Sequence, residues 1–244
     1  MRLDKPWNYP GLLLNFEPRS EVSMSSVVEN IEKLRTGIPG NVRLVAVSKT
    51  KPPGIIMDVY NTGHRAFGEN RVQELLSKKD NLPGDIEWHL IGHLQSNKVK
   101  FIAPFISMIQ SVDSFKLLKI INREAGLAGR KIDCLLQIHI ATEETKFGFD
   151  MTELEEMLSH PEFVLLKNIT VCGVMGMATF TDDVDLIRSE FRQLRKNFEY
   201  LRNKYFSVSD RFKEISMGMS GDYRIAVEEG STILRIGSRI FGER

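Results

Sequence analysis

A lysine at the end of an apolar segment is the first residue whose surroundings suggest chemistry. The segment LVAVSKTKP (44–52) runs from apolar residues directly onto Lys49. A charged side chain is costly at the end of a buried strand unless solvent, a partner or a reaction receives it. Lys49 is therefore either a surface lysine or a nucleophile that forms a Schiff base, which requires a neutral amine. Positive charge nearby lowers the pKa of a lysine, and Lys51 either supplies such charge or is solvated.

Two loops of small residues are candidates for binding an anion. The segment MGMSGDY contains Gly218, Ser220 and Gly221 ahead of an expected short helix, and RIGSRIFG adds Gly237 and Ser238. Backbone N–H groups and hydroxyls in such loops can bind phosphate, although small residues also mark ordinary tight turns. Neither a Walker A sequence nor a GxGxxG fingerprint occurs in the chain. A phosphate site and a pair of tight turns both fit these loops.

Arg235 and the histidines are the remaining candidates for a polar site. Arg235 lies in an apolar segment, 233–237, that is expected to form a strand. A guanidinium rarely points inward from a central strand without a partner, so Arg235 faces either a helix carboxylate outside or a polar ligand atom inside. The histidines lack the close carboxylate or cysteine spacing of a metal site, and no metal is predicted. They are His64, His89, His93, His139 and His160.

Alternating strands and helices must position these residues. The expected strands are 43–48, 65–68, 86–91, 107–110, 132–140, 170–177, 214–217 and 233–237, and segments of helical character separate them. Parallel strands need such crossovers, and eight of them in this length predict a single (β/α)8 TIM barrel of the α/β class. An open doubly wound sheet is the alternative. An extra helix at about 21–36 is expected to cover the gap left by the few residues after Gly237.

The strand ends of such a barrel bring the candidate residues together. Active sites of TIM barrels lie at the carboxyl ends of the strands, and phosphate sites favour the loops after strands seven and eight. The residues expected at this end are Lys49, 69–71 (Glu-Asn-Arg), 92–98, Ser111, Asp113, 143–148, Met177, 217–222 and 237–239.

The composition excludes several classes of protein. The 244 residues carry a formal net charge of +1, from 33 basic and 32 acidic residues, which argues against a nucleic-acid footprint. No apolar run has the length of a membrane span, and both cysteines lie in apolar segments, as reduced core thiols do. These features predict a cytoplasmic protein with an irregular N-terminal leader (1–20) and one barrel domain (21–244).

Several motifs in this order resemble the pyridoxal phosphate homeostasis protein family. They are LVAVSKTKP, FGENRVQE, WHLIGHLQSNK, GVMGMA, SMGMSGDY and EEGSTILRIGSRIFGER, and the resemblance covers about residues 21–244. It implies a barrel similar to the N-terminal domain of alanine racemase, with pyridoxal 5′-phosphate (PLP) held as an aldimine on Lys49. It further implies that Asn70 lines the cofactor, that Arg235 faces the pyridine nitrogen, and that the phosphate is cradled by Ser220, Gly237 and Ser238. The family often has threonine at 238 and an acidic residue at 224, where this chain has Ser238 and Arg224.

Two functions fit such a site: a carrier that stores, buffers and delivers PLP, or a weak fold-type III amino-acid racemase. Racemisation needs a second base opposite Lys49, and no tyrosine of this chain is an evident one. The C-terminal β domain of alanine racemase is also expected to be absent. A guanidinium beside the pyridine nitrogen disfavours ring protonation and weakens the electron sink. The sequence therefore favours a carrier with little activity, a monomer or weak dimer that donates PLP to apo-enzymes. A barrel that binds another phosphate ligand is the remaining alternative.

Overall fold

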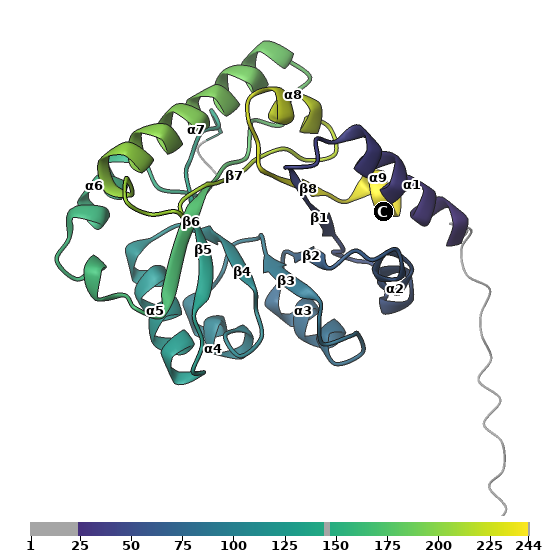
Figure 1. Ribbon diagram of the computed structural model, residues 1–244, viewed down its shortest axis with the longest axis horizontal. Helices are drawn as coiled ribbons and strands as arrows, with labels where there is room; N and C mark the ends of the chain where they lie inside the picture. Colours follow the sequence, from purple (N-terminus) through teal and green to yellow (C-terminus); the bar gives the residue numbers. More distant parts are fainter. Residues whose placement is uncertain (1–23, 144–146, 244) are drawn as a thin grey trace, which may run out of the picture.

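Eight parallel strands close into a barrel in the computed structural model, which describes residues 24–143 and 147–243. Each strand pairs with the next in chain order, and β8 pairs with β1 to close the barrel (Figure 1). This closure confirms the predicted TIM barrel and excludes the open sheet. The strands are β1 (Arg43–Val47), β2 (Ala66–Glu69), β3 (Glu87–Leu90), β4 (Met108–Val112), β5 (Ile132–Gln137), β6 (Ile169–Met175), β7 (Glu214–Ser216) and β8 (Ile233–Ile236).

Helices follow the strands and form the outer layer of the barrel (Figure 1). The longest, α7, buries an apolar stripe that includes Phe191, Leu194 and Phe198. It begins after Asp183, whose carboxylate accepts hydrogen bonds from the N–H groups of Asp185 and Leu186. The helices are α1 (Met24–Gly37), α2 (Pro53–Asn61), α3 (Val72–Lys79), α4 (Val99–Ile102), α5 (Phe115–Leu127), α6 (Met151–Ser159), α7 (Val184–Tyr205), α8 (Tyr223–Glu228) and α9 (Ser238–Phe241), with 3-10 helices η1 (Ser96–Lys98) and η2 (Phe163–Leu165).

Two apolar layers show which strand residues face the inside of the barrel. A large cluster fills the space between strands and helices and includes Leu44, Ala46 and Phe67. A smaller cluster occupies the inside and consists of Val45, Ala66, Met108, Leu135, Cys172, Met175 and Ile233. Because neighbouring residues of a strand face opposite sides, this inner set fixes the direction of the residues at the strand ends.

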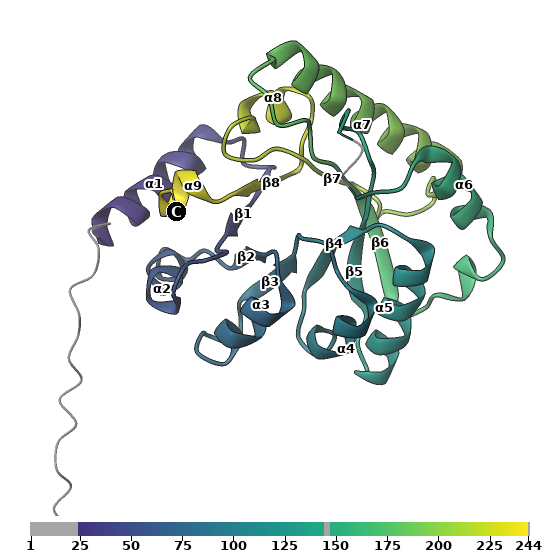
Figure 2. The same ribbon diagram turned by 180° about the vertical axis from the view of Figure 1, so that it is seen from behind.

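The N-terminal helix covers the end of the chain as predicted. The C-terminal α9 lies beside α1 in both views (Figure 2), and the Asn30 side chain donates a 3.2 Å hydrogen bond to the carbonyl of Ile240. The last strand is itself followed by the short helix α9, so both helices close the gap. The expected leader, 1–20, and residues 144–146 of the loop after β5 lie outside the described residues.

Candidate functional site

The carboxyl ends of β8, β1 and β2 bring three predicted site residues to one edge of the barrel. Val45 pairs with Arg235, and Val47 pairs with Gly68. The N–H of Ser48 continues the ladder by donating to the carbonyl of Gly68 at 3.0 Å. Lys49 and Asn70 follow β1 and β2 at this same end of the barrel.

Lys49 lies in the turn that follows β1 at the mouth of the barrel, where the N–H of Lys51 donates to the carbonyl of Ser48 at 3.0 Å. Val45, four residues earlier, belongs to the inner cluster, whereas the hydroxyl of Ser48 points outward and donates a 2.6 Å hydrogen bond to Glu69. The Lys49 side chain is half-buried.

A buried ion pair behind β1 fixes the backbone on both sides of Lys49. The ammonium of Lys78 donates to the carbonyl of Ser48 and to Glu69, each at 2.8 Å, and to Glu74 at 2.7 Å. Glu74 in turn accepts from the N–H of Thr50, which has a left-handed backbone with φ of 67°. The network therefore holds the residues immediately before and after Lys49.

The two carboxylates of this network have opposite pKa shifts. Burial raises the pKa of Glu69, although hydrogen bonds from Lys78 and Ser48 act against it. Burial also acts to raise the pKa of Glu74, but hydrogen bonds from Lys78 and Thr50 outweigh it and leave that pKa lowered. Among the described residues, Oε2 of Glu69 has no hydrogen-bond partner. Glu74 is thus the anionic partner of Lys78, and Glu69 is the more readily protonated one.

Sequence reasoning did not single out Lys78. It occupies the buried face of α3 together with Val72 and Leu75, at a spacing of three residues. The signal that could have revealed this buried ion pair is a lysine on an otherwise apolar helical stripe, with Glu74 one turn earlier.

Arg235 points into the barrel, which resolves the two alternatives for its direction. It lies two residues after Ile233 of the inner cluster and is 3% exposed. Its Nη1 donates to the hydroxyl of Ser216 at 2.6 Å, and its Nη2 donates to the carbonyl of Gly176 at 2.9 Å. Burial lowers the pKa of Arg235 to about 10, so the guanidinium remains charged at neutral pH.

The two small-residue loops meet at the ends of β7 and β8. The hydroxyl of Ser220 accepts from the N–H of Gly237 at 3.3 Å, and Arg239 donates to the carbonyl of Ser220 at 2.5 Å. Gly218 has φ of 95°, and a Cβ there would lie 2.5 Å from the Cβ of Ala226. A larger residue is therefore excluded at Gly218, whereas a Cβ at Gly221 would meet nothing within 4 Å. Ser238 begins α9 beside these loops.

Asn70 is packed against the loop after β3, whereas Lys51 is hydrogen-bonded to the end of the chain. The backbone of Asn70 is pressed against Gly92, where a Cβ would lie 2.4 Å from the carbonyl oxygen of Asn70. Lys51 donates to the carbonyls of Phe241 and Gly242 at 3.0 and 3.3 Å. Lys51 thus ties the loop after β1 to the end of α9, a role that neither sequence alternative anticipated.

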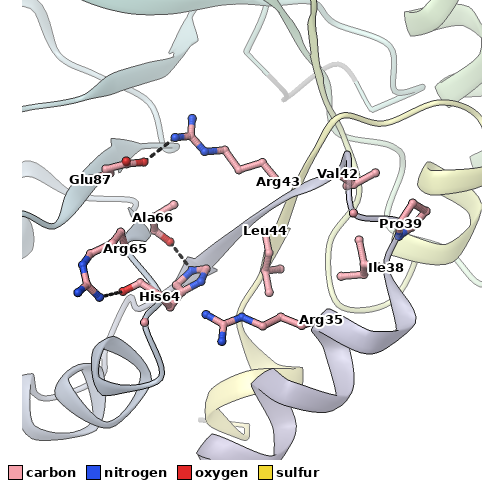
Figure 3. Close-up of a pocket in the computed structure, with 12 residues that line it drawn as sticks. Arg35, Ile38, Pro39, Val42, Arg43, Leu44, His64, Arg65, Ala66 and Glu87 are labelled. Carbon is pink, nitrogen blue, oxygen red and sulfur yellow. Dashed lines mark hydrogen bonds and ion pairs between the residues drawn. The ribbon is translucent and has the colours of Figure 1, made fainter.

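A separate cavity lies at the amino ends of the strands, away from Lys49. Arg35, Arg43 and Arg65 surround it together with His64 and Glu87 (Figure 3). Each guanidinium already has a carboxylate partner: Glu32, Glu87 and Asp85, respectively. The charge of this cavity is therefore balanced within the protein, and the predicted site residues are not part of it.

Residues 24–143 and 147–243 contain neither a cluster of metal-binding side chains nor a helix suited to cross a membrane. No group of three or more metal-binding side chains occurs among them. None of their helices combines the length and apolar character needed to cross a membrane.

The fold and the family model agree on the class of protein. The model described as alanine racemase, N-terminal domain, matches residues 22–244. The alanine racemase of Clostridium difficile 630 shares the fold at a TM-score of 0.73 with 13% identity, over 90% of this chain and 57% of that one. The protein is thus a barrel of the alanine racemase N-terminal-domain class.

More similar relatives narrow this class. A pyridoxal phosphate homeostasis protein of Aquifex aeolicus is 39% identical over 226 residues, covering 91% of this chain and 96% of that protein. Its human counterpart is 41% identical over 212 residues, covering 83% and 76%. The structure of PipY of Synechococcus elongatus PCC7942 with PLP bound has a TM-score of 0.80 and 36% identity, covering 88% and 100%. The chain belongs to the pyridoxal phosphate homeostasis protein family, which confirms the resemblance seen in its motifs.

Proposed function

We propose that this protein binds PLP at the mouth of its barrel, holds it on Lys49, and serves as a carrier in PLP homeostasis. The observation that carries the proposal is Arg235, a buried cation inside the barrel whose described hydrogen-bond partners are neutral. A buried guanidinium that is hydrogen-bonded only to neutral groups can still donate to a ligand that supplies an acceptor, while Asp222 acts on its charge and tends to raise its pKa. The PLP-bound structure of PipY, a relative of this chain, supports the choice of ligand.

The residues at the mouth match the chemical groups of PLP. When bound, PLP supplies an aldehyde that condenses reversibly with a primary amine, an unprotonated ring nitrogen and a phosphate dianion. Lys49 offers the amine from the turn after β1. Arg235 is a donor that cannot be deprotonated under ordinary conditions and so suits the ring nitrogen as an acceptor. Ser220 and Ser238 offer hydroxyl donors to the phosphate, Gly237 lies between them with its N–H donating to the Ser220 hydroxyl, and Asn70 lines the opposite edge.

The described tyrosines support a carrier over a racemase. The hydroxyl of Tyr60 donates to Asp85 at the amino end of the barrel, and Tyr200 and Tyr205 lie on the outer helix α7. Tyr223 lies on α8 beside the small-residue loops, with its hydroxyl accepting from Arg224. We expect none of these described tyrosines to act as a base opposite Lys49, and a site with one base can hold and release PLP without turning substrates over. We expect apo-enzymes that need PLP to be the acceptors.

Reduction with borohydride tests where PLP is attached. The PLP-loaded protein is reduced, digested and mapped by mass spectrometry, and the pyridoxyl group should be found on Lys49. Lys49→Ala should lose the visible absorbance of the lysine-bound cofactor and keep the fold. Lys131→Ala, an exposed lysine at the amino end of the barrel, is the matched control and should retain it. A pyridoxyl group on Lys51 or Lys146 instead of Lys49 would refute the assignment.

Transfer and turnover separate the carrier from the racemase. The loaded protein, mixed with an apo-enzyme that requires PLP, should restore that enzyme's activity as its own visible absorbance falls. With L-alanine in D₂O, the protein should give little α-deuteration above free PLP. Steady formation of D-alanine that Lys49→Ala abolishes would show a racemase, and failure to donate PLP to any acceptor would remove the carrier role.

A further inference from the structure

A chain of four buried polar side chains crosses the inside of the barrel and ends on Arg235. Arg235 donates to Ser216 at 2.6 Å, Ser216 contacts Gln110 at 2.6 Å, and Gln110 contacts His89 at 2.8 Å. All four are at most 3% exposed. They come from β8, β7, β4 and β3, so the chain spans the barrel from one side to the other. His89 and Gln110 have no part in the predicted PLP site.

The chemistry of Arg235 fixes the direction of every hydrogen bond in this chain. A guanidinium only donates, so the oxygen of Ser216 accepts from it and the Ser216 hydroxyl donates onward. Its acceptor is Oε1 of Gln110, which leaves the Gln110 amide nitrogen to donate to Nδ1 of His89. His89 must therefore be neutral with its proton on Nε2. Burial lowers the pKa of His89 to about 3, in agreement with this state.

The arrangement controls how Arg235 is presented to the mouth. Ser216 and the carbonyl of Gly176 occupy one N–H of each terminal nitrogen, which fixes the plane of the guanidinium. A carboxylate in place of Gln110 would neutralise the charge, whereas this chain of neutral groups orients Arg235 and leaves the charge available. If His89 were protonated on both ring nitrogens, its Nδ1–H and the amide N–H of Gln110 would be two donors facing each other across 2.8 Å. The hydrogen bond between Gln110 and His89 would then be lost.

We infer that His89 and Gln110 are positioning residues that orient Arg235 toward the ring nitrogen of PLP through Ser216. This inference rests on the proposed function for the identity of the ligand. It goes further in assigning a role to two residues on the far side of the barrel. Because hydrogen bonds in a low-dielectric interior polarise one another, the loss of one member should loosen the guanidinium even though Arg235 itself is intact.

The first test needs no ligand. In the PLP-free protein labelled with ¹⁵N-histidine, the shifts of the His89 ring should show a proton on Nε2 and an acceptor at Nδ1 at neutral pH. A proton on Nδ1 would reverse the last bond and overturn the inference, whatever the protein binds.

The second test compares PLP with an analogue in which the ring nitrogen is replaced by C–H. Wild type should prefer PLP, and Gln110→Met, which keeps the volume but cannot relay the bond, should lose about tenfold in affinity for PLP and little for the analogue. Gln137→Met is the matched control, because Gln137 is also a buried glutamine, on β5, and it donates to the carbonyl of Phe147 rather than to this chain. Any loss of affinity in Gln137→Met should be equal for PLP and for the analogue.

The outcomes separate the inference from the proposed function. Equal losses for both ligands in Gln110→Met would show a merely structural role for Gln110. In the Arg235→Met background the preference for PLP should be gone, and adding Gln110→Met should change nothing more; a further loss confined to PLP would overturn the inference. If Gln110→Met does not fold, Ser216→Ala carries the same comparison. Failure of wild type to bind either ligand would instead refute the proposed function and leave the histidine measurement standing.

Discussion

At the scale of single residues, two buried cations of the described residues have different kinds of partner: Lys78 on α3 behind β1, and Arg235 inside the barrel. Lys78 has carboxylate partners on two sides, at 2.8 Å from Glu69 and 2.7 Å from Glu74. Arg235 has a hydroxyl and a carbonyl as its described partners. Lys78 is thereby neutralised and serves the backbone around Lys49, whereas Arg235 keeps an available charge beside the proposed ligand.

Replacing Lys78 tests this structural role. Lys78→Met leaves Glu69 and Glu74 without their cation, and removing one partner of a buried ion pair costs about 3–5 kcal/mol of the free energy of unfolding. Urea denaturation monitored by circular dichroism measures the change. The double variant Lys78→Met/Glu69→Gln should recover part of the loss because it also removes the buried carboxylate. A Lys78→Met protein as stable as wild type would show that the ion pair contributes nothing.

At the scale of elements, the ends of β7 and β8 form the proposed phosphate cradle. Replacing Ser220 and Ser238 by alanine should weaken the binding of PLP much more than the binding of pyridoxal, because only PLP carries the phosphate dianion. Each charge-assisted hydrogen bond contributes about 1.5–3 kcal/mol, which is roughly ten- to a hundredfold in affinity. Titrations of both ligands by absorbance measure the ratio. Equal losses for PLP and pyridoxal would locate the phosphate elsewhere.

The close approach of β6 and β7 depends on one glycine. Gly173 has φ of 153°, and a Cβ there would lie 1.8 Å from the carbonyl oxygen of Glu214 on β7. Gly173→Ala should therefore push the strands apart and lower the free energy of unfolding by about 3 kcal/mol or more. Gly84→Ala is the control, since a Cβ there meets nothing within 4 Å, and its stability should be close to wild type.

At the scale of the whole molecule, two buried histidines make stability depend on pH. Burial lowers the pKa of His64 to about 4 and that of His89 to about 3, while both are near 6.5 in the unfolded chain. The unfolded state therefore binds more protons below pH 6.5, and the folded state loses stability as the pH falls. The stabilisation from each histidine is complete above 6.5 and is lost progressively down to its folded pKa.

Urea denaturation between pH 6 and 5 tests this dependence. Each histidine should contribute a slope approaching about 1.4 kcal/mol per pH unit. His64→Gln should remove roughly half of the combined slope. A variant that keeps the full slope would show that His64 is protonated in the folded protein or that other groups dominate.

The amino-acid sequence by itself determined the barrel, because alternating apolar segments and helical stripes at this spacing allow few other packings. It also identified Lys49 and the small-residue loops, since a lysine after an apolar strand and glycines before a helix are local signals. The direction of Arg235, the ion pair of Lys78 and the chain from His89 to Arg235 came only from the tertiary structure. Gln110 and Ser216 are 106 residues apart in the chain, and their contact exists only because the closed barrel directs β4 and β7 toward the same interior. Hydrogen bonds between such distant strands leave no periodic pattern in a sequence.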